Sequence, residues 1–553
     1  MGSSAGDRTH AVTPAARRVA TGLAGAAALI AAITVASRLV GFVRLQVMAQ
    51  TVGTSCLGTA YTTANAVPNV VFEVVVGGAL AGSVVPLLAG SMARGDHRVT
   101  RQTVAALYGW VLALLLPAMV AVAVLRGPLA TALLGDAGNA CPTNDVHDTA
   151  ATFLAIFALQ IPLYGLTVVS QGALQAGHRF ASPALAPLVS SLVVIGVYLA
   201  YAESAGHDAG SLQTLTTAQL SLLGFGTTLG VLVLLLVQLP ASVRQGLLVW
   251  PRLHFPATVG PRARALAGAG LATVAAQWIA YAVALRLVND HGPEGASVVF
   301  VLGWTVFLLP WAVLVFPVAT SVFPRLATLH DHAEPDQFAA TTADATRAVV
   351  LLATLGAAGL ATVAAPLARF LVEGAPGRPS TTELAATITA FALGVIGFGL
   401  VGFAGRVLYA AHRGRLAATV TVAGWVIGLG LAVIGSFSLS ESAVVPGVAA
   451  AASVGLLVAG LVLVGVLGRV VGRRALHGLG RAAAAAAVGG VVATGLGRLV
   501  VAGCPWHGVW GSALTAVLGG VAVVAAFLAM VAWVDPDDLR RLARRGGEAG
   551  VVG

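Results

Sequence analysis

The chain has 553 residues, of which 58% are hydrophobic and 9% are charged, and its mean hydropathy of +0.91 predicts a membrane protein with many spans. The net charge is +10, and all 31 basic residues are arginines. The absence of lysine excludes a Walker-type phosphate loop and a lysine general base. The arginines fall in short clusters between apolar segments, which indicates membrane topology rather than nucleic-acid binding.

Fourteen apolar segments are long enough to cross a bilayer, which takes about 20 residues of helix. They predict an all-α polytopic membrane protein, and they lie at residues 25–50, 61–90, 102–125, 149–173, 183–202, 217–239, 264–287, 296–323, 347–370, 384–410, 415–437, 443–468, 482–502 and 510–534. We expect residues 1–18 to form a disordered cytoplasmic N-terminus and residues 535–553 a cytoplasmic tail.

The arginines divide unevenly between the two sides of these spans. With the N-terminus in the cytoplasm, 24 of the 31 arginines fall in inward loops, and the five in outward loops are Arg126, Arg286, Arg369, Arg378 and Arg498. Because basic loops stay on the cytoplasmic side, this asymmetry places both termini in the cytoplasm.

The first span carries the two remaining arginines. Arg38, Gly41 and Arg44 are three residues apart, so they follow one ridge of a helix with a side-chain gap in its middle. Two guanidinium groups beside an open backbone patch suit a phosphate or a diphosphate. Both arginines also fit an interfacial anchor, because the apolar run is longer than the bilayer is thick, and the sequence leaves both readings open.

The second span adds further polar side chains. Glu73 is the only acidic residue inside a predicted span, and it is a counter-ion for an arginine of the first span, a proton-coupling group, or a carboxylate that merely faces a wet cavity. Asn65 and Asn69 flank Pro68, which frees a backbone carbonyl. The two amides either line the same cavity or satisfy the kink.

Cysteine and histidine do not predict a metal or a redox site. Cys56, Cys141 and Cys504 all fall in predicted outward loops, where one disulfide is possible, but their odd number and irregular spacing favour three unpaired residues. The inward loop at residues 330–336, HDHAEPD, matches none of the usual zinc motifs. We expect no metal and no cofactor.

Aromatic residues in the seventh and eighth spans are candidates for stacking on sugars. Trp304, near the middle of its span, is the one predicted to contact a ligand, whereas tryptophans near span ends are assigned to interfacial belts. No Ser/His/Asp, His-Glu-x-x-His or paired-carboxylate arrangement points to an enzyme.

Two short motifs recur at nearly one offset. Residues 83–89 (SVVPLLA) return as 321–327 (SVFPRLA) after 238 residues, and His178-Arg179 returns as His412-Arg413 after 234. The repeats predict two six-helix lobes in the same orientation, a transporter design with its substrate site between the lobes. The expected units are an N-lobe at 19–240, a cytoplasmic linker at 241–263, a C-lobe at 264–468 and two further helices at 482–534.

The first span also suggests a family. SRLVGFVR at residues 37–44 resembles the S-R-x-x-G-F-x-R signature of the MurJ/MviN lipid II flippases, which belong to the multidrug/oligosaccharidyl-lipid/polysaccharide exporter superfamily. Similar pieces follow at Pro68-Asn69, Tyr164-Gly165 and Leu309-Pro310, and the resemblance covers roughly residues 20–470. Phe72 stands where many members have an arginine.

The resemblance implies a V-shaped exporter fold in the bacterial cell (inner) membrane. It implies that the chain moves lipid II, the undecaprenyl-diphosphate-linked disaccharide-pentapeptide, to the outer leaflet by alternating access. It implies that Arg38 and Arg44 bind the diphosphate, that the two C-terminal helices hold the lipid tail among membrane lipids, and that cell-wall synthesis proteins are partners. Three alternatives stay open. They are an exporter of another polyprenyl-linked glycan or a small molecule, a membrane-embedded glycosyltransferase, and a scaffold that binds lipid II without transporting it.

Overall fold

The computed structural model describes residues 14–74, 84–135, 141–256, 259, 271–377, 380–506 and 508–534, and within these ranges it contains helices and no strand. The first half is built from α1 (Pro14–Thr51), α2 (Cys56–Phe72), α3 (Val84–Ala93), α4 (His97–Val124), α5 (Arg126–Leu134), α6 (Thr143–Phe157), α7 (Gln160–Ala176), α8 (Ala181–Ala205), the short η3 (Gly206–Asp208) and α9 (Thr217–Arg244).

The second half contains α11 (Leu271–His291), α12 (Ala296–Pro310), η4 (Trp311–Val315), α13 (Phe316–Asp331), α14 (Pro335–Val372), α15 (Thr381–Ala410), α16 (Gly414–Ser436) and α17 (Glu441–Val470). After it come η5 (Arg473–Leu476), α18 (Leu479–Gly503) and α19 (Gly508–Val534). One π-helical turn, η4, follows Pro310, whose missing N–H interrupts the regular hydrogen bonds of a helix that otherwise continues to Asp331.

Twelve of the described helical segments are long and apolar enough to cross a membrane. They match twelve of the fourteen predicted spans. The predicted span at 61–90 is represented by α2 and α3, with residues 75–83 outside the described part, and the span at 264–287 by α11, with residues 264–270 outside it. The first helix is longer than predicted, because α1 has 38 residues and therefore a length of about 57 Å.

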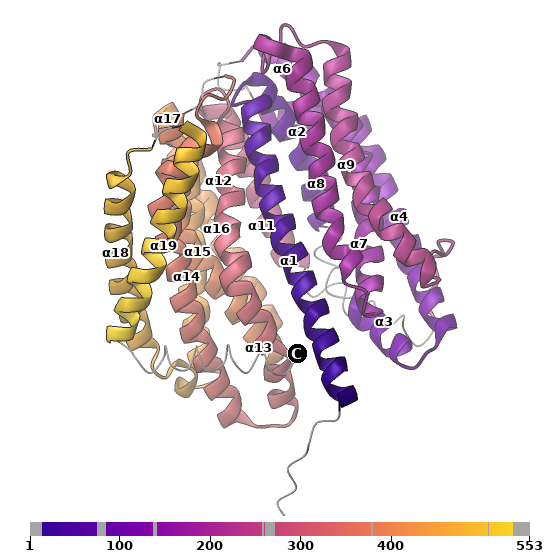
Figure 1. The fold of residues 1–553 in the computed structure, drawn as a ribbon, viewed down its shortest axis with the longest axis vertical. Helices are drawn as coiled ribbons and strands as arrows, with labels where there is room; N and C mark the ends of the chain where they lie inside the picture. Colours follow the sequence, from indigo (N-terminus) through magenta and orange to yellow (C-terminus); the bar gives the residue numbers. More distant parts are fainter. Residues whose placement is uncertain are drawn as a thin grey trace, which may run out of the picture.

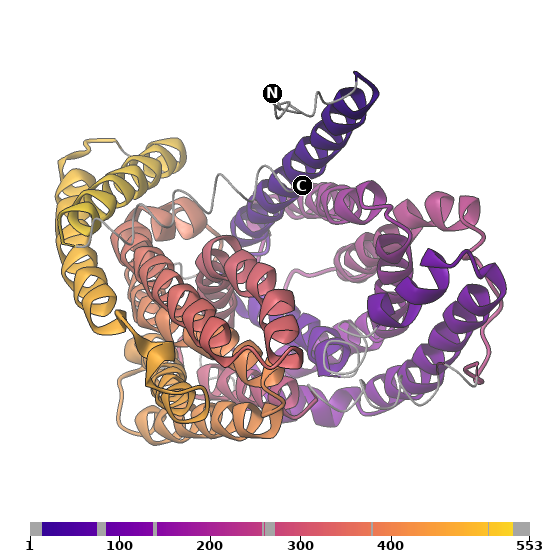
Figure 2. The same ribbon diagram turned by 90° about the horizontal axis from the view of Figure 1, so that it is seen from below.

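The helices form two lobes with a further pair of helices on one flank. α1 to α9 make the N-lobe and α11 to α17 the C-lobe, and the lobes meet at the upper end in Figure 1 and diverge toward the lower end (Figures 1 and 2). α18 and α19 pack on each other and on α14, at the edge of the C-lobe. This is the predicted V-shaped arrangement.

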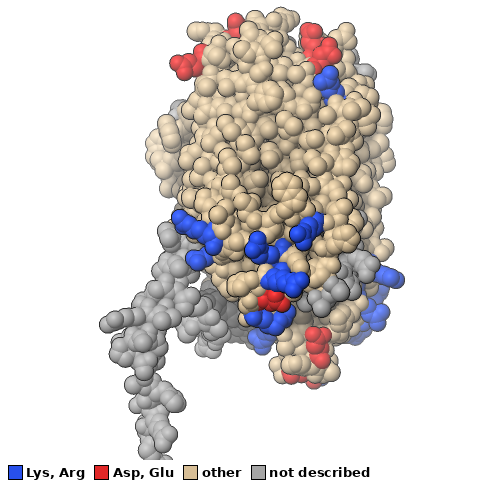
Figure 3. Space-filling view, turned by 90° about the vertical axis from the view of Figure 1, so that its right-hand side faces the viewer, with Lys and Arg blue, Asp and Glu red and all other residues tan. Residues whose placement is uncertain are grey.

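Charged side chains leave a wide belt of the surface free. On the face shown in Figure 3, arginines form a band across the lower part of the molecule, and the broad middle carries no charge. An uncharged belt between charged ends is the surface that a bilayer requires.

The two lobes repeat one turn geometry. α3 and α13 end in the same turn, with Gly95 (φ 68°) and Ala333 (φ 55°) in the left-handed region, and α7 and α15 do so with His178 (φ 57°) and His412 (φ 56°). In all four turns the next N–H donates to the carbonyl five residues earlier, at 2.7 to 3.0 Å, which is the Schellman helix end. The turns occupy the repeated offsets of 238 and 234 residues, so the repeat is visible in the backbone as well as in the sequence.

Candidate functional site

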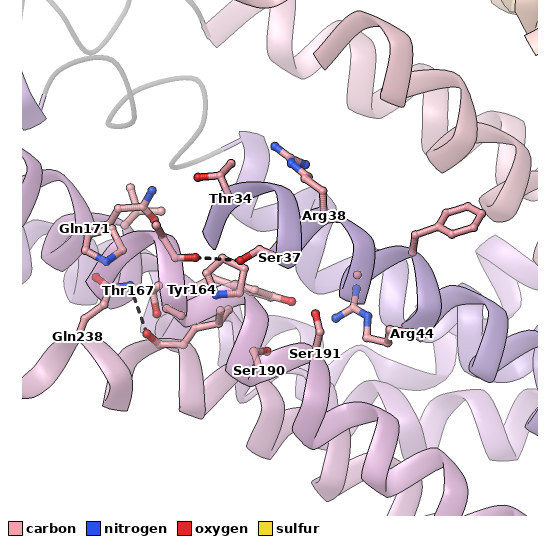
Figure 4. A pocket seen from close by; sticks show the side chains of 18 of the residues that line it. Thr34, Ser37, Arg38, Arg44, Tyr164, Thr167, Gln171, Ser190, Ser191 and Gln238 are labelled. Carbon is pink, nitrogen blue, oxygen red and sulfur yellow. Dashed lines mark hydrogen bonds between the residues drawn. The ribbon is translucent and has the colours of Figure 1, made fainter. Parts of the chain in front are cut away.

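A cavity of about 740 Å³ lies among α1, α7, α8 and α9 of the N-lobe, with two residues of α12 completing its wall. No Asp or Glu is among its lining residues in the described part of the chain. Figure 4 shows that polar side chains from α1, α7, α8 and α9 converge on it. The polar lining consists of Thr34, Ser37, Arg38, Arg44, Tyr164, Thr167, Gln171, Gln175, Ser190, Ser191, Gln238 and Thr305.

The structure brings Arg38, Gly41 and Arg44 to this cavity. The two arginines are about 120° apart around α1 and about 9 Å apart along it, because six residues separate them. In Figure 4, Arg44 lies beside Ser191, and Arg38 projects from another side of α1. A Cβ added at Gly41 would have nothing within 4 Å, so the predicted gap between the arginines is open.

In the part of the chain that the structure describes, neither Arg38 nor Arg44 has an acidic partner. None of the ion pairs found within the described ranges includes Arg38, which is exposed, or Arg44, which is half-buried. The positive charge of the cavity is therefore uncompensated.

Contacts with both lobes hold α1 in this position. The Ser37 hydroxyl donates to the carbonyl of Ala184 on α8 at 3.0 Å, and Phe42 stacks on Phe370 of α14 with ring centroids 5.8 Å apart. Phe72, at the position where the resemblance leads one to expect an arginine, lines the cavity and packs against Tyr164. The cavity wall therefore carries the aromatic ring of Phe72 at the position where the resemblance implied a third arginine.

The predicted residues of the second span lie elsewhere. Asn65, Asn69 and Glu73 are not among the residues that line the cavity. The Asn69 side chain donates to the carbonyl of Asn65 at 2.9 Å, one turn before the end of α2, which agrees with the local role that the sequence left open for it. Glu73 forms no ion pair with Arg38 or Arg44, so the counter-ion reading does not hold in this structure.

Trp304 is packed inside the C-lobe. Its side chain is only 6% exposed, and its ring lies 5.4 Å from Tyr281 and Phe307, 5.8 Å from Phe391 and 6.2 Å from Trp425, measured between centroids. Its neighbour Thr305 lines the cavity instead. The structure thus gives Trp304 a packing role and leaves no open ring face for a sugar.

Sequence reasoning missed the amide side of the cavity. Gln171 and Gln175 of α7 and Gln238 of α9 all line it. One signal was available: Tyr164, Thr167, Gln171 and Gln175 follow one another at intervals of three or four, which places polar groups on a single face of an otherwise apolar helix.

At the upper end in Figure 1 the two lobes are joined by a row of hydrogen bonds. The Thr54 N–H donates to the carbonyl of Pro376 at 2.9 Å, and the Gln50 amide donates to two carbonyls at the end of α14, those of Leu371 and Glu373. Side chains of α2 contact α11 and α12 through the pairs Thr63 and Asn289 (3.0 Å) and Thr62 and Ser297 (3.3 Å). We call this set of contacts the interlobe closure.

A disulfide lies next to the interlobe closure. Cys56 at the start of α2 is bonded to Cys141, just before α6, and only Cys504 is free among the three cysteines. The expectation of three unpaired cysteines is therefore wrong. The chain brings together two residues that are 85 positions apart, because α2 packs along α6.

The family model described as Lipid II flippase MurJ matches residues 48–517. The chain belongs to this family. The match begins after Arg44, so membership of the MurJ family does not depend on the two arginines of α1.

Named relatives agree with this membership. The chain is 30% identical over 182 residues to the probable lipid II flippase MurJ of Rhizobium meliloti (strain 1021), and 27% identical over 229 residues to that of Vibrio cholerae serotype O1 (strain ATCC 39315 / El Tor Inaba N16961). These alignments cover 33% and 40% of this chain, and only 34% and 41% of the relatives' own lengths.

Solved structures share the fold. A lipid II flippase MurJ in an inward closed conformation matches 92% of this chain and 99% of its own, with a TM-score of 0.67 at 16% identity. An inward-facing multidrug resistance transporter of the MATE family matches 79% of this chain and 94% of its own, with a TM-score of 0.60 at 12% identity. The chain thus shares its fold with solved structures of both kinds.

Proposed function

We propose that this chain is a lipid II flippase, which carries the undecaprenyl-diphosphate-linked disaccharide-pentapeptide from the inner to the outer leaflet by alternating access. The observation that carries the proposal is the cavity with two unpaired arginines and no acidic residue in its described lining. Such a site suits a diphosphate, because guanidinium groups bind phosphate oxygens through charge-assisted hydrogen bonds. Membership of the MurJ family supports lipid II as the cargo.

We propose further that the end of the molecule with the disulfide faces outward and that both termini are cytoplasmic. Disulfides form in oxidising compartments, and the bias of the arginines toward the opposite loops agrees with that orientation. In this orientation the interlobe closure seals the outer side, and the cargo enters from the cytoplasm.

The charge of the cavity speaks against a cation exporter of the same fold. A site for a cation needs acidic or other anionic groups, whereas the described lining offers two guanidinium groups and neutral amides and hydroxyls. A scaffold would bind lipid II in the same cavity as a flippase does. Only a measurement of lipid II movement across the bilayer separates these two functions.

The test is complementation together with transport. In a bacterium depleted of its own lipid II flippase, we expect the wild-type chain to restore growth and Arg38→Ala or Arg44→Ala, expressed to equal levels, to lose rescue. Removing one charge-assisted contact lowers diphosphate affinity about tenfold or more. Arg325→Ala, an exposed arginine of α13 outside the cavity lining, serves as the matched control and should keep rescue.

Each outcome has a defined meaning. Rescue that survives both cavity substitutions contradicts diphosphate binding at α1. A wild-type chain that binds lipid II in reconstituted vesicles but does not expose it on the opposite leaflet contradicts transport and supports the scaffold.

A further inference from the structure

One face of α7 supplies the cavity with uncharged polar groups. Tyr164, Thr167, Gln171 and Gln175 line the cavity from successive turns of this helix, over a length of about 16 Å. Two glutamines in a membrane-embedded helix are costly unless their amides find partners. Their position therefore calls for a reason beyond the packing of the N-lobe.

These amides are available for a ligand. Gln171 and Gln175 are half-buried, and neither side-chain amide forms a hydrogen bond to another described residue. The Gln50 amide, in contrast, donates two hydrogen bonds in the interlobe closure. Gln238, on the facing helix α9, is completely buried. Its Nε2 donates to the carbonyl of Leu234 at 3.2 Å, but its Oε1 has no partner in the part of the chain that the structure describes. An unsatisfied acceptor in a cavity wall is destabilising until a donor reaches it.

The amides lie apart from Arg44. In Figure 4, Gln171 and Gln238 lie toward the end of the cavity where Thr34 begins the α1 lining, whereas Arg44 lies toward the opposite end. The helices that carry them run antiparallel, α1 toward the interlobe closure and α7 away from it, so the distance from Arg44 increases from Tyr164 to Gln175.

The two ends of the cavity suit different chemistry. Arginine offers only donors and a positive charge, which selects an anion. A glutamine amide offers donors and acceptors without charge, which suits the hydroxyl groups of a sugar and the amides of an N-acetyl group or a peptide. The cavity thus matches a ligand that has an anionic part and a neutral polar part side by side.

We propose that Gln171 and Gln175 form a subsite for the glycan and peptide portion of the cargo, and that this subsite acts separately from the arginine subsite. The inference rests on the proposed function, because it divides the same cavity into two parts. It makes the amides the residues that distinguish a full head group from a bare lipid diphosphate.

The experiment measures binding of two probes to the purified full-length chain, one being undecaprenyl diphosphate and the other lipid II. For Gln171→Leu/Gln175→Leu we expect lipid II affinity to fall about tenfold, since two hydrogen-bonding groups are lost, and undecaprenyl diphosphate affinity to stay within about twofold. For Arg44→Ala we expect both probes to weaken by the same factor. Gln337→Leu, at an exposed position of α14, is the control for the glutamine substitution itself.

The outcomes separate this inference from the proposed function. If the double variant binds lipid II like the wild type, or loses both probes equally, the amide subsite is wrong while diphosphate binding stands. If the wild-type chain binds neither probe, the proposed function itself fails. The single variants Gln171→Leu and Gln175→Leu are measured beside the double variant, so that a folding defect in the latter does not prevent a decision.

Discussion

Gly41 lies at the point where the backbone of α1 is bare between two arginines. Nothing in the described structure comes within 4 Å of the position that its Cβ would occupy. A glycine in the middle of a helix is less favourable than alanine by about 1 kcal/mol, so a glycine that is not required by packing invites a functional explanation.

We predict that Gly41→Ala raises the melting temperature of the purified chain slightly and lowers its rescue of flippase-depleted cells. The methyl group stabilises the helix but fills the patch that a diphosphate approaches. Gly430→Ala is the matched control, because Gly430 is an exposed glycine inside α16 whose Cβ also meets nothing within 4 Å. Equal rescue by the two variants would show that the gap has no part in binding.

Some residues of the cavity were predictable from the sequence and others were not. Arg38 and Arg44 could be found from the sequence because a charge inside an apolar run has few structural explanations. Gln171 and Gln175 could not be separated from surface or packing residues, since an isolated amide is compatible with many positions. Trp304 was misjudged because mid-span depth is not the same as a position on the cavity wall; the C-lobe buries its ring among other aromatics.

At the scale of the helices, the Cys56–Cys141 disulfide links the start of α2 to the segment just before α6. The bond closes a loop of 85 residues, for which loop-closure entropy gives a stabilisation of about 4 kcal/mol in the chain-entropy model. It lies outside the cavity and beside the interlobe closure, since the Cys56 N–H also donates to the Glu294 carboxylate of the C-lobe at 3.3 Å.

We predict that Cys56→Ser/Cys141→Ser lowers the melting temperature by several degrees and that a reductant lowers that of the wild type to the same value. Both treatments remove the same constraint on the unfolded chain. Cys504→Ser, which removes the free cysteine, should leave the melting temperature unchanged. A wild-type chain insensitive to reductant would contradict the bond.

The helices themselves were largely predictable from the sequence, but which helices pack against each other was not. Apolar length alone located the spans, because a helix that crosses a bilayer must satisfy its own backbone. The pairing of Cys56 with Cys141 depends on how α2 and α6 pack, which no spacing in the sequence encodes. The turn that recurs in both lobes was partly predictable. The two His-Arg pairs of the sequence indicated two of its four copies.

For the molecule as a whole, transport requires the interlobe closure to open. Thr62 of α2 and Ser297 of α12 bring their hydroxyl oxygens within 3.3 Å across the lobes, close enough for a disulfide if both became cysteine. Ser170 and Ser242 offer an equivalent pair at 3.0 Å inside the N-lobe, joining α7 to α9.

We predict that oxidised Thr62→Cys/Ser297→Cys abolishes lipid II transport in vesicles and that oxidised Ser170→Cys/Ser242→Cys preserves it. The first pair ties the lobes together at the outer end, whereas the second links two helices that move as one body. Mass spectrometry of the intact chain checks that each bond has formed. If the chain cross-linked between positions 62 and 297 transports lipid II as fast as the wild type, opening of the interlobe closure is not needed for transport.

The interlobe closure combines side-chain hydrogen bonds with a close approach of the two main chains. Cβ atoms added at Gly53, Gly295 or Gly377 would come within 3 Å of backbone atoms of the opposite lobe, and several of the hydrogen bonds that join the lobes end on carbonyl oxygens. The lobes therefore approach closely enough to bond only because these three positions carry no side chain. A larger residue at any one of them would act as a wedge and would favour the state in which the lobes are parted at this end.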